Sequence, residues 1–241
     1  MRYTKISMTD VIIAGAGAAG LMTAITAARR GLSVTVLEPN GKTGKKLRIT
    51  GKGRCNVTNN CTSDEVLKNV PVNPRFLYSA LGAFSPADVK AFFEEKGVAL
   101  KTERGNRVFP VSDRSQSVLD ALERFLCAYH VPILPRKAAE IAVSDGRVTG
   151  VKTAEGPVPA DCVILATGGL SYPATGSTGS GYAMAQDEEG QIITSVHSVE
   201  LGERITLRVS DGQLGCTVMK QFPFETREKE QNRNGSKEET L

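Results

Sequence analysis

The chain has 241 residues and a formal net charge of +4; 40% of its residues are hydrophobic and 23% are charged. This balance is that of an ordinary globular protein with enough apolar residues for a core. No apolar run approaches the ~20 residues that a membrane-spanning helix needs, and so small a net charge does not by itself indicate a nucleic-acid or membrane partner.

A glycine-rich turn follows the first apolar run. Residues 11–13 have the pattern of a short buried strand, and Gly15, Gly17 and Gly20 follow in G-x-G-x-x-G spacing. In a dinucleotide-binding turn the first glycine permits the tight turn, the second lets the backbone approach a pyrophosphate, and the third lets the helix pack on the sheet. The helix N-terminus offers unpaired N–H groups to the phosphates. A glycine-rich turn in another kind of α/β protein is the alternative interpretation.

The elements after these glycines strengthen the prediction. An alanine-rich helical pattern runs to Gly31, residues 34–37 form a second strand, and Glu38 ends it. An acid at this position binds the hydroxyls of an adenosine ribose. The sequence therefore predicts a strand–helix–strand unit that binds a dinucleotide.

A basic run comes directly after the ribose-binding acid. Residues 42–54 contain six cations and no acid, with glycines between them. We interpret this run as a loop that wraps a phosphorylated cofactor; a solvated basic face is the alternative. Nucleic acid is disfavoured as a partner, because the chain has no Trp and no aromatic residue interrupts the run. The cations are Lys42, Lys45, Lys46, Arg48, Lys52 and Arg54.

The rest of the chain alternates helices and strands. A predicted strand at residues 158–165 runs directly into an Ala-Thr-Gly-Gly sequence, which indicates a second close approach of the backbone to the cofactor. A simple strand-to-loop turn is the alternative there. The order of elements favours an α/β, Rossmann-like domain of the two-dinucleotide-binding flavoprotein type over a plain NAD domain. The other predicted elements are helices at 86–95 (capped by Ser85), 115–129 and 182–189, a strand at 131–134, and a hairpin of residues 141–143 and 148–151 around Asp145-Gly146.

Three regions are predicted. Residues 1–193 form the Rossmann-like domain with its small β element. Residues 194–221 form a segment with possible strands at 205–209 and 213–218. Residues 222–241 are polar and are expected to be disordered.

The chemistry-bearing residues give no catalytic constellation. His130 and His197 receive no catalytic role, and no cluster of His, Cys and carboxylates has metal-ligand spacing. Cys55 lies beside Arg54, which favours a lowered thiol pKa, although a small packed thiol is the preferred interpretation. The five cysteines form no C-x-x-C pair, and the N-terminus lacks an apolar signal-peptide core, so a cytoplasmic protein with free thiols is expected. The cysteines are Cys55, Cys61, Cys127, Cys162 and Cys216.

Three segments together resemble the BaiN-like family of bacterial flavoproteins, also described as NAD(P)/FAD-dependent or aminoacetone oxidase family enzymes. They are DVIIAGAGAAGLMTAITAARRG, GKKLRITGKGRCNVTN and VILATGGLSYPATGSTGSGYAMA. The middle segment is the most specific of the three. The resemblance covers roughly residues 10–193.

The resemblance implies a non-covalently bound FAD, with reduced nicotinamide, NAD(P)H, as the electron donor and a small-molecule substrate. One family member is linked to reductive steps on bile-acid intermediates. By this resemblance a first group of residues holds the pyrophosphate and ribose, a second lies along the flavin, and a third forms a further contact strip. These groups are Gly15, Gly17, Ala18, Gly20 and Glu38; Lys46, Gly53, Arg54, Cys55 and Asn56; and Ala166, Thr167, Gly168 and Gly169.

The chain departs from the family after residue 194. The resemblance implies that residues 1–193 are an FAD-binding domain that is incomplete at the C-terminus, and that residues 194–221 are a divergent segment and the possible start of an inserted domain. Members are considerably longer: they enter an inserted cap domain and return to the FAD domain with a final strand and turn over the flavin. We therefore expect a truncated or frame-altered product, or a natural short form. Three hypotheses follow: an FAD-dependent oxidoreductase that uses NAD(P)H, a non-catalytic FAD-binding fragment, and a plain NAD-dependent dehydrogenase.

Overall fold

The computed structural model describes residues 9–144, 147–181, 184, 204–209 and 212–217. The chain divides into two compact units, residues 1–184 and 185–241. The predicted helix at 182–189, the expected disordered tail and the boundaries at 193 and 221 lie outside the described residues, so they stay predictions.

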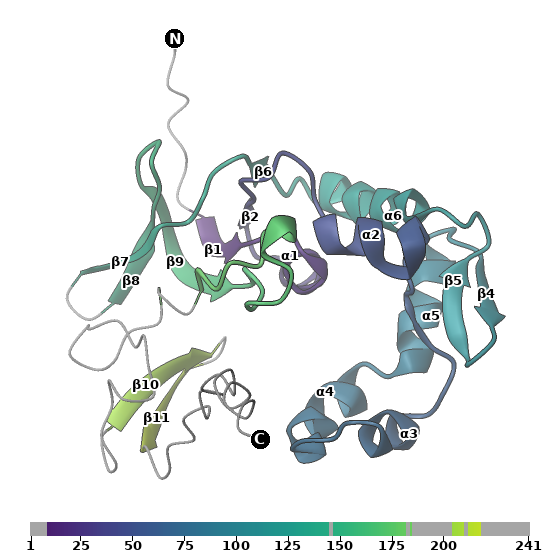
Figure 1. Cartoon of the computed structure of the whole chain (residues 1–241). Helices are drawn as coiled ribbons and strands as arrows, with labels where there is room; N and C mark the ends of the chain where they lie inside the picture. The colour runs from purple at the N-terminus through teal and green to yellow at the C-terminus, as the bar shows by residue number, and fades with distance from the viewer. Residues whose placement is uncertain (1–8, 145–146, 182–183, 185–203, 210–211, 218–241) are drawn as a thin grey trace, which may run out of the picture. The chain divides into compact units, whose positions relative to one another are not determined.

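A six-stranded sheet forms the centre of the first unit, in the order β6-β2-β1-β9-β8-β7 (Figure 1). β1 pairs in parallel with β2 and β9, and β2 pairs in parallel with β6. β9, β8 and β7 are antiparallel neighbours. The α/β, Rossmann-like class is thereby confirmed. The strands are β1 (Thr9–Ala14), β2 (Val34–Leu37), β6 (Ile133–Leu134), β7 (Glu140–Ser144), β8 (Arg147–Lys152) and β9 (Val158–Leu165).

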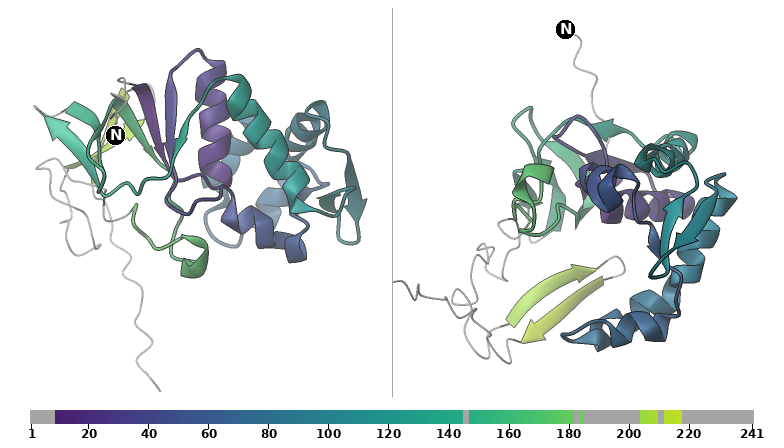
Figure 2. Two further views of the ribbon diagram at one scale, coloured as in Figure 1. Left: turned by 90° about the horizontal axis from the view of Figure 1, so that it is seen from above. Right: turned by 45° about the vertical axis from the view of Figure 1, so that its right-hand side comes forward.

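The central strands are apolar because both of their faces are covered, as in parallel sheets generally. Helices α1 (Ala18–Arg29) and α6 (Ser115–Ala128) lie side by side against one face (Figure 2). Ile13 and Val36 pack there with Leu122. On the other face Ile12 and Leu37 pack with residues of β8 and β9.

A second, smaller region lies between β2 and α6 in the sequence. It contains a three-stranded antiparallel sheet of β3, β5 and β4. It also contains a helical arm, formed by α3, the short 3₁₀ helix η1 and α4. Two helices of this region begin with reciprocal capping boxes, Thr62 with Glu65 and Ser85 with Asp88. The elements are β3 (Thr58–Asn59), α3 (Ser63–Lys68), η1 (Pro74–Leu77), α4 (Tyr78–Ala83), α5 (Pro86–Glu95), β4 (Leu100–Glu103) and β5 (Arg107–Pro110).

The structure corrects the prediction that the basic run is a loop. Residues Lys45–Gly53 form helix α2, kinked over its last turn. The helix rests on α6: Arg48 donates to the Gln116 side chain at 2.6 Å, and the Ser115 hydroxyl donates to the Arg48 carbonyl at 3.2 Å. These contacts come from residues almost seventy positions away, and tertiary contacts of this kind override weak local propensity.

The other elements agree with the sequence within a few residues. The helices at 86–95 and 115–128, the hairpin of β7 and β8 and the strand β9 are all present. The strand predicted at 131–134 is reduced to Ile133–Leu134. A short 3₁₀ helix, η2 (Pro173–Thr175), follows β9. In the second unit β10 (Arg204–Val209) and β11 (Gly212–Thr217) form an antiparallel pair, which confirms the two possible strands.

Phe109 is the largest fully buried side chain of the first unit's described part, at 1% exposure, whereas Phe76 on the helical arm is 80% exposed. We expect Phe109→Ala to lower the free energy of unfolding by about 3–5 kcal/mol, because the substitution removes a packed ring and leaves a cavity. The matched control Phe76→Ala is expected to change it by less than about 0.5 kcal/mol. Urea unfolding of the three proteins measures both values, and equal losses would contradict the assignment of Phe109 to the core.

Candidate functional site

The glycine turn joins β1 to α1, and its three glycines have different structural roles. Gly15 has φ +107°, and a Cβ there would lie 2.5 Å from the Ala166 carbonyl oxygen. A Cβ at Gly20 would lie 1.9 Å from the carbonyl oxygen of Gly15. Gly17 has an extended backbone, and a Cβ there would meet nothing within 4 Å. The fold itself therefore requires the first and third glycines but not the second.

The N-terminus of α1 is open. Gly17 is the N-cap residue and supplies no side-chain hydrogen bond, and Ala18 and Ala19 in the first turn are exposed. The first N–H groups of a helix have no partner within it, and with the helix dipole they form a site for an anion. A phosphate group fits this position because no side chain of the turn covers it.

Glu38 connects the end of β2 to the glycine turn. Its side chain is buried, with one carboxylate oxygen accepting from the Ala16 N–H at 2.9 Å. The other oxygen accepts from the backbone N–H of Asn40 at 2.9 Å and from its side-chain amide at 2.6 Å. An ionised carboxylate has about four acceptor positions, so Glu38 retains capacity for a ligand hydroxyl. The carboxylate has a structural role that the sequence did not indicate.

A cavity of about 240 Å³ lies where β1, β2 and β9 end. β1 has β2 on one side and β9 on the other, so this is the point where the strand order reverses, at which open α/β sheets bind their ligands. Glu38 and Thr167 come together here although they are far apart in the sequence. The cavity is lined by Ala14, Gly15, Leu37, Glu38, Pro39, Asn40, Lys137, Ala138, Thr167, Gly176, Thr178 and Ser180.

The Ala-Thr-Gly-Gly segment continues β9 beyond the sheet. The Ala166 N–H donates to the Ala14 carbonyl at 2.8 Å, which holds the segment against the end of β1. A Cβ at Gly168 would lie 2.6 Å from the Ser177 hydroxyl, and the Gly169 carbonyl accepts from the Gly179 N–H at 3.1 Å. Residues 166–169 are thus packed against the segment that follows η2, and this contact explains the glycine at position 168.

The last turn of α2 and the residues after it form a second part of the candidate site, residues 50–56. Gly51 and Gly53 have positive φ, and so do the non-glycine residues Lys52 (φ 60°) and Cys55 (φ 65°). A left-handed conformation costs a non-glycine residue about 1–3 kcal/mol, so the surrounding structure must hold this backbone. A Cβ at Gly51 would lie 2.5 Å from the Phe109 ring, which excludes any larger residue.

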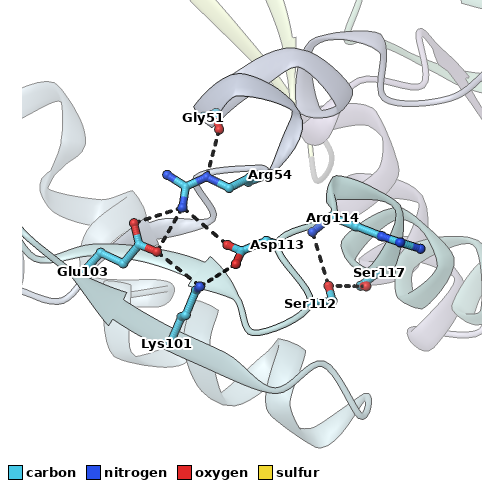
Figure 3. A network of polar contacts seen from close by, with 8 residues as sticks. All are labelled: Gly51, Arg54, Lys101, Glu103, Ser112, Asp113, Arg114 and Ser117. Carbon is cyan, nitrogen blue, oxygen red and sulfur yellow. Dashed lines mark hydrogen bonds and ion pairs between the residues drawn. The ribbon is translucent and has the colours of Figure 1, made fainter.

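An ion network lies next to this segment (Figure 3). Arg54 pairs with Glu103 at 2.9 Å and with Asp113 at 3.3 Å, and Lys101 pairs with the same two carboxylates at 3.3 Å and 2.7 Å. Arg54 also donates through Nε to the Gly51 carbonyl at 3.3 Å. Two cations thus face two carboxylates, and the network joins the end of α2 to the β4–β5 hairpin.

The carboxylates of this network have lowered pKa values. Hydrogen bonding from Lys101 lowers the pKa of Asp113 below its ordinary 3.8, with a further contribution from Arg54. Desolvation raises the pKa of Glu103, but the hydrogen bonds and charges of Arg54 and Lys101 outweigh it and hold that pKa below its ordinary 4.5. Both groups are therefore ionised at neutral pH.

Cys55 is a packed thiol. Its side chain is 1% exposed and lies in the same core cluster as Ala16 and Leu21, next to the glycine turn. Burial raises the pKa of the thiol, and a hydrogen bond with Thr50 offsets this only in part. The possible lowering by Arg54 is not found, because the charge of Arg54 is matched by Glu103 and Asp113. The thiol is packed, as the preferred interpretation expects, and its place near the flavin stays a prediction.

Two other residues of this group differ in their surroundings. Asn56, with its amide oriented to donate, reaches the carbonyls of Thr58 at 3.0 Å and Val108 at 3.2 Å, which ties it to β5. Lys46 is half-buried on α2 and has no hydrogen-bond or ion-pair partner within the described residues. Neither residue, nor Gly53 or Arg54, lines the cavity at Glu38.

Asn40 and Lys137 line the cavity and were missed from the sequence. Asn40 stands two positions after Glu38, where a short polar side chain is typical of a turn. Lys137 follows β6, and no pattern in the sequence connects that position with β2. In the described part of the chain, no group of three or more His, Cys, Asp and Glu residues is arranged to hold a metal. No helix of that part has the length and apolar character needed to cross a membrane.

We expect the thermal stability to fall as the pH is lowered through the depressed pKa values of Glu103 and Asp113. A carboxylate whose pKa is lower in the folded than in the unfolded protein stabilises the fold when the pH is above the unfolded-state pKa. This contribution is lost as the pH falls through the folded-state pKa. Melting temperatures measured between about pH 6 and pH 3 should therefore fall more steeply in the unchanged protein than in the Glu103→Gln/Asp113→Asn double variant. Parallel curves would contradict the network's contribution.

Comparison with known proteins identifies the family. A protein-family model described as "HI0933-like protein Rossmann domain" matches residues 9–222. The chain is 35% identical over 181 residues to a 3-dehydro-bile acid delta(4,6)-reductase of Clostridium scindens, covering 74% of this chain and 44% of that protein. It is 33% identical over 184 residues to a ribosomal RNA dihydrouridine synthase of Haemophilus influenzae, covering 74% of this chain and 45% of that protein. A protein of the same name from Escherichia coli is 29% identical over 177 residues.

The chain spans a little under half the length of these curated relatives. The matched region includes the glycine turn, the strained segment and the Ala-Thr-Gly-Gly strip, and the resemblance to BaiN-like flavoproteins is confirmed. The chain belongs to the HI0933-like Rossmann-domain family.

Proposed function

We propose that this chain binds FAD non-covalently, with the pyrophosphate at the N-terminus of α1 and the adenosine in the cavity beside Glu38. The observation that carries the proposal is the open backbone at Gly17, a glycine that the packing of the described residues does not require. It stands next to a cavity at the switch point of the sheet, lined by a buried carboxylate with free acceptor capacity. The plain NAD-dependent dehydrogenase becomes the less favoured hypothesis, because the family match supports a flavoprotein.

The remaining predicted site residues are assigned to the same cofactor. Gly15, Gly20 and Ala18 shape the pyrophosphate site, and residues 166–169 form the second backbone contact. Lys46, half-buried and without an ion-pair partner among the described residues, contributes its charge to the phosphates or to the reduced flavin. When bound, FAD supplies the hydride chemistry, while the residues of this chain bind the cofactor and exclude water from it.

We also propose the reaction class of the longer proteins to which this domain corresponds. The names of the relatives describe a delta(4,6)-reductase of a 3-dehydro-bile acid and a synthase of dihydrouridine in ribosomal RNA. Both names describe the reduction of a carbon–carbon double bond conjugated with a carbonyl group. We therefore propose NAD(P)H-dependent reduction of such a double bond, in which a hydride is added at one carbon and a proton at the other. A non-catalytic FAD-binding fragment is the alternative for this chain alone.

The absorbance spectrum of the purified protein, before and after incubation with FAD and gel filtration, tests the binding proposal. A retained flavin band with one FAD per chain is the expected result. NADH and NADPH oxidation by the FAD-loaded protein, with an artificial acceptor, then separates an oxidoreductase from a non-catalytic fragment. A protein that stays colourless after reconstitution would overturn the proposal.

Gly17→Val is expected to weaken FAD binding by at least roughly tenfold, while lowering the melting temperature of the FAD-free protein only by the modest cost of Val at an N-cap position. The added Cβ meets no protein atom within 4 Å, so the substitution acts mainly by obstructing an approaching pyrophosphate. Gly20→Ala is the matched comparison and should lower the melting temperature, because its Cβ collides with the Gly15 carbonyl. FAD titration and thermal unfolding of both variants measure these effects, and full FAD affinity in Gly17→Val would contradict the site.

Glu38→Ala is expected to lower both stability and FAD affinity. The substitution leaves the Ala16 N–H without its acceptor, which costs about 1–3 kcal/mol of unfolding free energy. It also removes the acceptor for the ribose hydroxyls. Asn40→Ala retains the carboxylate and should keep most of the affinity, so equal FAD dissociation constants for the two variants would argue against a ribose contact at Glu38.

A further inference from the structure

We propose that Arg54 is a positioning residue: its ion pairs hold the strained segment 50–56 in the conformation that supports the glycine turn, at which the pyrophosphate is proposed to bind. This inference rests on the proposed FAD binding and deepens it. It assigns a role to the network of Arg54, Lys101, Glu103 and Asp113 (Figure 3), and it removes Arg54 from the set of direct ligands.

Two of the three guanidinium nitrogens of Arg54 already have partners, and only Nη2 has none among the described residues. Its Nη1 atom is shared between Glu103 and Asp113, and its Nε atom donates to the Gly51 carbonyl. Its guanidinium carbon lies 4.1 Å from the centre of the Phe109 ring, so one face of the group is covered. The two carboxylates already balance the charges of Arg54 and Lys101, and a phosphate would have to compete with them.

The segment that Arg54 contacts cannot hold its own conformation by local propensity. Lys52 and Cys55 are left-handed without being glycine. The hydrogen bond from Arg54 Nε acts directly on Gly51, one residue before Lys52. Arg54 itself lies between the strained residues Lys52 and Cys55. Because its side chain is anchored by the ion pairs and by Gly51, it restrains the backbone between these two residues.

The segment is also coupled to the glycine turn. Cys55 packs in the cluster that contains Ala16 and Leu21, and the Gly44 N–H at the start of α2 donates to the Ala16 carbonyl at 2.8 Å. The network therefore links a peripheral hairpin, through the strained segment, to the turn at which the pyrophosphate is proposed to bind. The most specific family motif of the chain coincides with this segment.

The test combines three variants with a control. Arg54→Ala removes the ion pairs between the network and segment 50–56 and leaves those of Lys101 in place. Arg54→Lys keeps the charge but loses the planar guanidinium with its several N–H donors. The Glu103→Gln/Asp113→Asn double variant removes the partner charges without changing residues 50–56. Lys152→Ala is the control, because it removes a 2.7 Å ion pair with Glu140 on the β7–β8 hairpin. Circular dichroism first establishes that each variant is folded.

Two readouts separate positioning from direct contact. The first is the alkylation rate of Cys55 in the FAD-free protein, followed by peptide mass spectrometry with the exposed Cys127 as internal reference. The second is the FAD dissociation constant, with the shape of the bound flavin's visible absorbance band. We expect Arg54→Ala and the double variant to speed Cys55 alkylation and weaken FAD binding by roughly tenfold, Arg54→Lys to recover part of both, and Lys152→Ala to match the unchanged protein.

Each other outcome overturns a different statement. Weaker FAD binding with unchanged Cys55 alkylation would make Arg54 a direct ligand and refute positioning. Unchanged FAD binding in Arg54→Ala, with binding intact in the parent protein, would refute the positioning role and leave the proposed function standing. Failure of the parent protein to bind FAD would refute the proposed function and the positioning role with it.

Discussion

The structure depends on one steric constraint, the close approach of three backbone segments at the end of β1. The turn after β1, the first turn of α1 and the residues after β9 meet where Gly15 and Gly20 leave room for carbonyl oxygens. The approach sets the position of the helix N-terminus relative to the strand ends. The cavity beside Glu38 lies at the same place because β1, β2 and β9 end together in parallel register. A single local requirement for small residues thus produces both the open helix N-terminus and the cavity next to it.

The first βαβ unit, α5, α6 and β9 could be predicted because their periodicity, capping residues and apolar runs are local signals. Helix α2 could not be predicted, because its cations and glycines are locally typical of a loop. The contacts that stabilise the helix come from α6, which is distant in the sequence. The three-stranded sheet was missed for a similar reason: β3 pairs with β5 over a separation of about fifty residues, and neither strand alternates clearly.

The candidate site divides in the same way. The glycine turn and Glu38 follow from spacing alone, because the chemistry and the fold impose the same residues there. The family motif located residues 53–56, but the roles of Arg54 and Asn56 depend on Glu103 and on β5, which no local pattern connects with them. The hydrogen bonds of Glu38 to Ala16 and Asn40 show a further overlap that spacing does not reveal: a residue expected to hold the ribose also holds the turn.

The helical arm has a different energetic character from the sheet. None of α3, η1 and α4 contains a buried residue, and α3 is stabilised locally by its capping box. Little apolar surface opposes its opening, so the arm forms a separate unit of low local stability. We expect its backbone amides to exchange with solvent through local openings that leave β1 and the glycine turn intact. Opening of this arm therefore costs little free energy and is expected to leave the packing around the cavity at Glu38 unchanged.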